Sequence, residues 1–153
     1  MRNFAWMDAI DLKFGIPNIE LGCASGEMVN PSSFAGHELV VLFCPLDPGA
    51  AFEEIAKFLA HSAEFVERDA WLLTIAERGG DLAVDGAGRA LKTIPDPGRH
   101  AWVAFRELTP HDEVMDRESG ATFLFTRGGN LHRYWQGSGH VDDVLAELKN
   151  PLS

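Results

Sequence analysis

A continuous hydrophobic stretch follows Glu38 and extends from residue 39 to residue 44. Six apolar residues without a polar interruption are too many for a strand with one face in water, and few enough for a strand that is buried on both faces. The pattern therefore predicts a buried strand at residues 38–44.

A turn with two prolines and a long amphipathic helix are expected next. Residues 45–49 (Pro-Leu-Asp-Pro-Gly) end the strand, with Asp47 as the helix N-cap and Pro48 as the first helical residue. We expect the helix to continue to residue 66, with Glu53 and Glu54 in its first turn, where the helix dipole favours negative charge. The apolar positions have helical spacing, with one main stripe and a flanking stripe: Phe52, Ile55, Leu59 and Val66, then Phe58 and Phe65.

A second buried strand is predicted at residues 70–75 (Ala-Trp-Leu-Leu-Thr-Ile), so that residues 38–75 form a right-handed βαβ unit with parallel strands. Residues 76–91 contain four glycines, but their spacing does not fit a dinucleotide-binding motif. We therefore expect a loop there, with at most a short helix.

The clearest hairpin consists of residues 121–126 and 131–135, joined by the turn Arg-Gly-Gly-Asn at residues 127–130. A closing helix is predicted at residues 140–149, with apolar side chains at positions 141, 144, 145 and 148. Together the elements predict an α/β fold, with a central mixed sheet and helices on both faces.

The chain before the first central strand divides into two parts. Residues 1–15 carry six large apolar side chains, too many for a tail that stays in water, so this extension covers the edge of the domain or meets another subunit as a homodimer contact. Residues 15–23 predict an extended segment, residues 25–27 a turn, and Met28 and Val29 a short return strand. We expect the domain itself at residues 16–150.

Composition limits the classes of partner. A chain of 153 residues is most simply one domain with its own core. The net charge of −10 and the pI near 4.9 argue against nucleic acid as a partner. No stretch approaches the length of a membrane span, and the N-terminus has no continuous apolar core, so the cytoplasm is the expected location.

Cysteines and histidines offer little for metal or cofactor binding. The two cysteines, Cys23 and Cys44, lie in apolar surroundings without metal-ligand spacing, so each is expected to be a buried thiol. The six histidines show no His-x-x-x-His spacing, and His111-Asp112-Glu113 is expected to be a solvated loop. We expect neither a metal nor a cofactor.

The segment Leu42-Phe43-Cys44-Pro45-Leu46-Asp47, followed by Glu54-Ile55, resembles the active-site segment of the peroxiredoxins, the thiol peroxidases of the thioredoxin fold. Three further segments carry the same resemblance, and their order is that of the family. They are residues 33–37 before the first central strand, the Pro-x-x-Asp-Pro-type turn at residues 93–98 with a helix that packs Trp102, Val103 and Phe105, and the hairpin at residues 121–135. The resemblance covers residues 15–150 and implies a thioredoxin-like fold.

The family's reactive residues have no match in this chain. Its Pro-x-x-x-Thr-x-x-Cys segment, counted from Pro45, places threonine on Gly49 and the peroxidatic cysteine on Phe52, whereas alignment on Glu54 places that cysteine on Ala51. A thioredoxin-type pair of cysteines would fall on Pro48 and Ala51. Where the family has an arginine before the hairpin, this chain has Gly120 or Ala121, with Arg117 as the nearest candidate.

Two functions of different class follow from these residues. In the first, the chain is a peroxiredoxin-like module without the peroxidatic cysteine, which binds a partner or serves as a scaffold. In the second, it is a thiol oxidoreductase that uses Cys44 at the end of the first central strand, with a thiol or protein partner. The first hypothesis implies a vestigial active site. It consists of Arg117 and of the turn made by Pro45, Asp47, Pro48, Gly49, Ala51 and Phe52.

Overall fold

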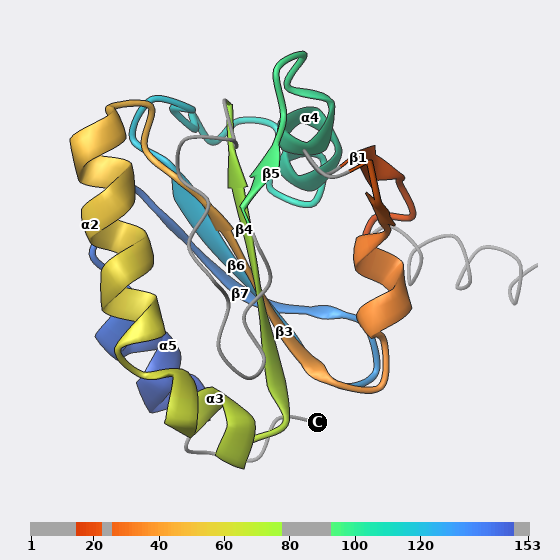
Figure 1. Cartoon of the computed structure of the whole chain (residues 1–153). Coiled ribbons are helices and arrows are strands. Elements are labelled where there is room, and N and C mark those ends of the chain that lie inside the picture. Colours follow the sequence, from red (N-terminus) through yellow and green to blue (C-terminus); the bar gives the residue numbers. More distant parts are fainter. Residues whose placement is uncertain (1–14, 23–25, 78–92, 149–153) are drawn as a thin grey trace, which may run out of the picture.

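The computed structural model describes residues 15–22, 26–77 and 93–148. A five-stranded mixed sheet forms its centre, in the order β5-β4-β3-β6-β7. Helices cover both faces, with α2, α3 and α5 on one side and α4 on the other, as Figure 1 shows. The α/β class and the mixed central sheet predicted from the sequence are therefore confirmed.

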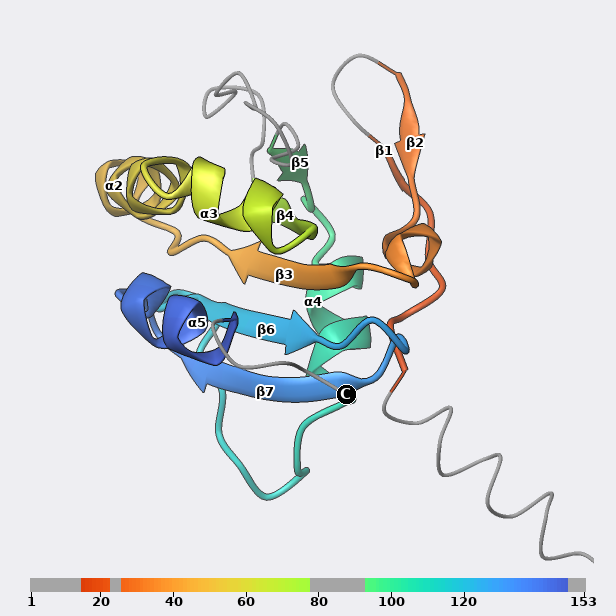
Figure 2. The same ribbon diagram turned by 90° about the horizontal axis from the view of Figure 1, so that it is seen from below.

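The two parallel strands of the predicted βαβ unit are β3 (Glu38–Phe43) and β4 (Ala70–Ala76), paired from Glu38 opposite Ala70 to Phe43 opposite Ile75. On the other side of β3, strand β6 (Ala121–Phe125) runs antiparallel, and β7 (Leu131–Gln136) completes the hairpin at the edge of the sheet (Figure 2). A two-residue strand, β5 (Ile94–Pro95), pairs with β4 at the opposite edge. The predicted strands and hairpin are confirmed.

The core consists of two apolar layers, because side chains of a strand alternate between the faces of the sheet. On β3, Val40 and Leu42 face the layer under α2, α3 and α5, and Cys44 follows them. Leu39, Val41 and Phe43 face the layer under α4. In that second layer, edge-to-face aromatic contacts surround Phe43, whose ring centroid lies 5.2 Å from Trp102 and 5.3 Å from Phe105.

The prediction of one long helix up to residue 66 is wrong, because the segment forms two helices, α2 (Pro48–Leu59) and α3 (Ser62–Glu67). The N–H of His61 bonds to the carbonyl of Phe58, three residues back, and the His61 imidazole bonds to the Glu64 carboxylate. These bonds close one helix and start the next, and α3 then leads directly into β4.

The buried face of α2 is also rotated from the predicted one. Ala51, Ile55 and Phe58 are buried, whereas Phe52 is 57% exposed and Val66 of α3 is 47% exposed. Asp47 is the N-cap and Pro48 the first helical residue, as predicted, so Glu53 and Glu54 lie beyond the first turn, contrary to expectation. A small alanine thus occupies the face where the pattern favoured a phenylalanine.

The remaining helices agree with their predicted positions. Helix α4 (His100–Arg106) buries Trp102 and Phe105 but leaves Val103 58% exposed, so Val103 is not the packing residue that was expected. Helix α5 (Val141–Leu148) buries all four predicted apolar positions. Strands β1 (Leu21–Gly22) and β2 (Met28–Val29) pair antiparallel, and a 3-10 turn, η1 (Pro31–Phe34), leads to β3.

Several predictions fall on residues outside the described part of the chain. They concern the extension at residues 1–14, Cys23, and most of the glycine-rich segment at residues 76–91. The domain division after residue 15 therefore stays a prediction.

A buried ion pair holds the beginning of β3. The Glu38 carboxylate is fully buried, and both of its oxygens accept hydrogen bonds from Nη2 of Arg68, at 2.9 and 3.2 Å. The Arg68 side chain is 30% exposed. The pair ties the start of β3 to the turn that follows α3.

Replacing Arg68 with methionine should therefore destabilise the protein by about 2–4 kcal/mol, because it leaves a buried carboxylate without this counter-charge. The double variant Arg68→Met/Glu38→Met should lose less than Arg68→Met alone, since it removes the charge as well. Urea denaturation at neutral pH measures both losses. A double variant that is less stable than the single one would contradict the assignment.

Candidate active site

Cys44 lies just beyond the last residue of β3, at the carboxyl end of the parallel strands, where α/β proteins place their sites. Its side chain is fully buried and belongs to the apolar layer that contains Ala51 and Ile55 of α2. Its backbone N–H donates to the carbonyl of Ile75 at 2.9 Å, so the strand pairing continues through this residue. Cys44 is a free thiol inside the core.

The surroundings of Cys44 oppose ionisation. Burial raises the pKa of the Cys44 thiol from 9.0 to about 12; the nearby Arg117 charge acts in the opposite direction, and the Glu54 carboxylate adds to the increase. Desolvation outweighs the arginine because a thiolate would lose most of its hydration at this position. The thiol is therefore protonated at neutral pH.

The turn after Cys44 directs a carboxylate, rather than a thiolate, to the N-terminus of α2. The Asp47 side chain accepts a hydrogen bond from the Ala50 N–H at 2.9 Å, and the Asp47 carbonyl accepts the Ala51 N–H at 2.9 Å. Free amide groups at a helix N-terminus are what stabilises an anion there. One of those groups, the Ala50 N–H, is already bonded to the Asp47 carboxylate, and the Ala51 N–H makes the first intrahelical bond.

The two positions to which the family's cysteine aligns lie on different sides of α2. Ala51 is buried beside Cys44 in the same apolar layer, and Phe52 projects into solvent. Pro45 lies in the connecting turn as predicted, whereas Gly49, also expected in that turn, is the second residue of α2. Neither Ala51 nor Phe52 carries a group that can attack a peroxide.

Arg117 approaches this region from the opposite side of β3. Its Nη1 donates to the carbonyl of Cys44 at 2.5 Å, and its guanidinium carbon lies 5.5 Å from the centre of the Phe43 ring and 5.6 Å from that of Trp102. The side chain is only 4% exposed, and burial lowers the pKa of the guanidinium. The structure thus brings Arg117, the nearest arginine before the hairpin in sequence, to the backbone of Cys44.

The position before the hairpin, Gly120, has no space for a side chain. Its φ of +83° belongs to the left-handed region, and a Cβ built on it would lie 2.5 Å from the carbonyl oxygen of Phe43 and 3.1 Å from the nitrogen of Pro45. The backbone of residues 43–45 therefore occupies the space that an arginine at position 120 would need.

Three buried or half-buried carboxylates, whose contacts were not predicted from the sequence, organise this end of the molecule. Glu54 of α2 accepts the Gly139 N–H, with oxygen distances of 2.9 and 3.1 Å, which holds the segment before α5. Asp96 accepts the N–H groups of Ala101 and Trp102 at the start of α4, and an aspartate shortly before a helix was a usable signal for it. The third, Glu113, was expected in a solvated loop.

Glu113 instead ties the segment after α4 to β7. It accepts hydrogen bonds from the Tyr134 hydroxyl and from the Gln136 amide. Burial, and then the bond to Glu113, raise the pKa of Tyr134 to about 12. Nothing in the local sequence indicates this pairing, because its partners are about 20 positions apart.

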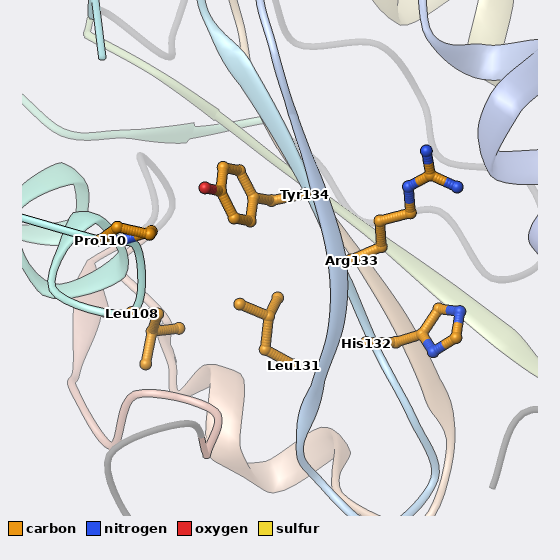
Figure 3. Close-up of a pocket in the computed structure, with 6 residues that line it drawn as sticks. All are labelled: Leu108, Pro110, Leu131, His132, Arg133 and Tyr134. Atoms are coloured by element: carbon orange, nitrogen blue, oxygen red, sulfur yellow. The ribbon is translucent and has the colours of Figure 1, made fainter. Parts of the chain in front are cut away.

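A hollow of about 380 Å³ lies beside this pairing, between the segment after α4 and the outer strand β7. Leu108 and Pro110 line one side and Leu131 and Tyr134 the other, as Figure 3 shows, whereas His132 and Arg133 project away from it. The hollow is therefore mainly apolar and is formed by elements other than the turn at Cys44.

The described residues contain no group of three or more histidine, cysteine, aspartate or glutamate side chains that could hold a metal ion. Across residues 15–22, 26–77 and 93–148, no helix has both the length and the apolar character needed to cross a membrane.

The raised pKa of Cys44 predicts how stability depends on pH. Because the folded state resists ionisation, the contribution of the thiol is complete below about pH 9 and is lost as pH rises towards 12, at about 1.4 kcal/mol per pH unit. Cys44→Ala removes buried volume and should be less stable than the parent protein at pH 7.5, and this difference should shrink by about 2 kcal/mol by pH 10.5, because only the parent's thiol ionises on unfolding. Urea denaturation of both proteins at the two pH values checks this, since Cys23 and Tyr134 are common to both; an unchanged difference would contradict it.

Restoring an arginine at position 120 should damage the fold instead of creating a site. Gly120→Arg and Gly120→Ala should each cost about 2–4 kcal/mol, because both place a Cβ against the Phe43 carbonyl in a left-handed conformation. Gly137→Ala is the matched control, since its φ is also positive but nothing lies within 4 Å of its Cβ. Thermal denaturation should show a smaller loss for that control, and equal losses would show that the contact at Gly120 is unimportant.

Neither protein-family models nor curated protein sequences give a match to this chain. Solved structures do. The bacterioferritin comigratory protein of Xanthomonas campestris, described as active in alkyl peroxide reduction, is 25% identical, with a TM-score of 0.67 over 89% of this chain and 96% of that one.

Two other peroxiredoxins share only the fold with this chain. The mitochondrial 2-Cys peroxiredoxin of Plasmodium falciparum is 18% identical, with a TM-score of 0.64 over 90% of this chain and 91% of that one. A cysteine-to-serine mutant of the peroxiredoxin 6 of Arenicola marina is 15% identical, with a TM-score of 0.68 over 89% and 71% of the two chains. The sheet order, the helix positions and these similarities together show that the chain has the peroxiredoxin-like form of the thioredoxin fold.

Proposed function

We propose that this protein is a non-catalytic member of the peroxiredoxin-like group, which acts as a binding or scaffold module. The observation that carries the proposal is the state of Cys44, a fully buried thiol whose pKa is raised to about 12. Reduction of a peroxide begins with attack by a thiolate, and a protonated thiol in the core supplies none.

The N-terminus of α2 supports the same conclusion. In a thiol peroxidase the reactive sulfur would use the amide groups and the dipole of such a helix to stay ionised. Here the Asp47 carboxylate bonds to the Ala50 N–H, and its negative charge disfavours a second anion nearby. Ala51 and Phe52 bring no sulfur to this position.

Arg117 has a structural role in this proposal. It bonds to the Cys44 carbonyl and lies against two aromatic rings of the α4 layer, where cation–π contacts partly replace its lost hydration. The Cys44 side chain belongs to the other layer, under α2. The arginine thus supports the backbone of this segment while the sheet separates it from the thiol's apolar pocket.

A thiol oxidoreductase that uses Cys44 is the second candidate. The observation in its favour is that the charge of Arg117 lowers the pKa of Cys44, as an activating arginine would. Burial outweighs that effect, so this activity would require the segment around Cys44 to open before reaction. A thiol compound or a protein is the partner class for either function, and the cytoplasm is the compartment that we expect for it.

Consumption of peroxide distinguishes the two functions. The purified full chain, supplied with dithiothreitol and either hydrogen peroxide or cumene hydroperoxide, should consume peroxide no faster than the reductant alone. Cys44→Ser and Cys23→Ser variants should behave identically to it. Rapid consumption that is lost in Cys44→Ser would establish the oxidoreductase, and rapid consumption lost only in Cys23→Ser would also overturn the non-catalytic proposal.

A further inference from the structure

An apolar stripe stays exposed along α2 and α3, roughly a third of a turn from the side that packs on the sheet. Its residues follow one another at intervals of four and three, which is the spacing of a coiled-coil seam. Phe52, Ala56, Ala63 and Val66 are exposed, and Leu59 is half-buried at the margin of the core. The two helices therefore present a second apolar face, apart from the one that enters the core.

The break between the two helices leaves the direction of this stripe almost unchanged. Phe58 and Phe65 lie seven residues apart on either side of the break, yet both are buried and their rings stack with centroids 6.3 Å apart. Leu59 and Val66 are the residues that follow them, so these two also share one direction. Figure 1 shows α2 and α3 one after the other along one side of the molecule.

An acidic edge runs beside the stripe. Glu53 and Glu67 each come directly after an exposed stripe residue, and Ala60 holds the equivalent position between them, seven residues from each. Both glutamates are exposed. In a coiled coil such positions flank the seam and meet the edge of the facing helix, where opposite charge stabilises the pair. The α2 lysine, Lys57, lies farther round the helix from the seam, so the flanking edge is acidic.

This edge decides against a second copy of the chain as the occupant of the stripe. In an antiparallel pair of these helices, the flanking edge of one copy faces the same edge of the other, so Glu53 would meet Glu67 twice. Like charges in facing positions weaken such a pair, and the net charge of −10 adds repulsion in any orientation. A helix with basic flanks meets the same carboxylates with opposite charge.

We propose that the exposed face of α2 and α3 binds an amphipathic helix of another protein, with apolar side chains against Phe52, Leu59 and Val66 and with Lys or Arg beside Glu53 and Glu67. The alanines of the stripe let the two helices approach closely, because the distance between packed helices depends on the side chains at the contact. The inference rests on the proposed function, a binding module, and names the class of its partner.

Two synthetic peptides test the proposal on the full chain. Each has about 21 residues, or three heptads, with leucine at the seam positions, and the flanking positions carry lysine in one peptide and glutamate in the other. Fluorescence anisotropy at about 0.15 M salt should show that the lysine peptide binds at least about tenfold more tightly. Failure of the lysine peptide to saturate below about 1 mM would overturn the proposal.

Paired substitutions locate the bound peptide. Phe52→Ser with Val66→Ser should weaken binding of the lysine peptide by at least about tenfold, since both ends of the stripe lose their apolar side chains. Val103→Ser with Val114→Ser is the matched control, because these two valines are also exposed but lie outside α2 and α3. The control should change the affinity by less than about twofold. Equal losses in the two double variants would place the peptide elsewhere and overturn the assignment.

A second pair of double variants tests the acidic edge. Glu53→Gln with Glu67→Gln should weaken binding of the lysine peptide by at least about threefold. Glu107→Gln with Glu118→Gln removes the same charge from exposed positions outside α2 and α3 and should have a smaller effect. Equal effects would show that the overall charge attracts the peptide, contrary to the proposed edge.

Sedimentation velocity tests the alternative occupant. The free chain should show no self-association that Phe52→Ser with Val66→Ser abolishes, and such an effect would show that a second copy occupies the stripe instead. The outcome is separable from that of the proposed function. Absence of peptide binding would overturn this inference and leave the non-catalytic assignment in place, whereas rapid peroxide consumption would overturn that assignment whatever the peptide does.

Discussion

The structure depends on the close packing of the backbone at residues 43–45, where β3 ends. Gly120 lies so near that a single added carbon would be 2.5 Å from the Phe43 carbonyl. The Cys44 N–H and carbonyl are bonded to Ile75 and Arg117, and the Leu46 N–H is bonded to the Glu118 carbonyl. Every one of these contacts joins β3 to a segment remote in sequence, so the end of the strand is closed on both faces of the sheet. The Cys44 side chain that this segment carries is fully buried.

This packing also connects the electrostatics of the region to its chemistry. Alternation along β3 sends the Cys44 side chain into the apolar layer under α2, while Arg117 reaches the same residue from the layer of α4. The arginine therefore acts on the thiol only through the charge it carries across the backbone, and desolvation prevails. At the start of α2, Asp47 supplies the negative charge that the helix dipole favours. Arg117 and Asp47 thus each make a hydrogen bond that stabilises the fold.

The sequence predicted the strands, the hairpin and the closing helix because their patterns are local: an unbroken apolar run, a turn with two glycines, and apolar positions at helical spacing. It also identified Asp47 and Pro48 at the start of α2. It assigned the wrong face of that helix, because Phe52 is larger and more apolar than Ala51, yet Ala51 is buried and Phe52 is exposed. The break at residues 60–61 was not predictable from spacing, since Phe58 and Phe65 keep helical separation across it. Long-range contacts, such as Glu54 with Gly139 and Glu113 with Tyr134, leave no local signal.

The most direct test of the account is the reactivity of the Cys44 thiol in the native protein. In a Cys23→Ser background, alkylation by iodoacetamide should be slow at neutral pH, should not show an apparent pKa below 9, and should become rapid on addition of denaturant, because the sulfur is buried and its pKa is raised. Rapid alkylation of the folded protein with an apparent pKa below about 7 would contradict the account, since a pKa in that range belongs to activated cysteines.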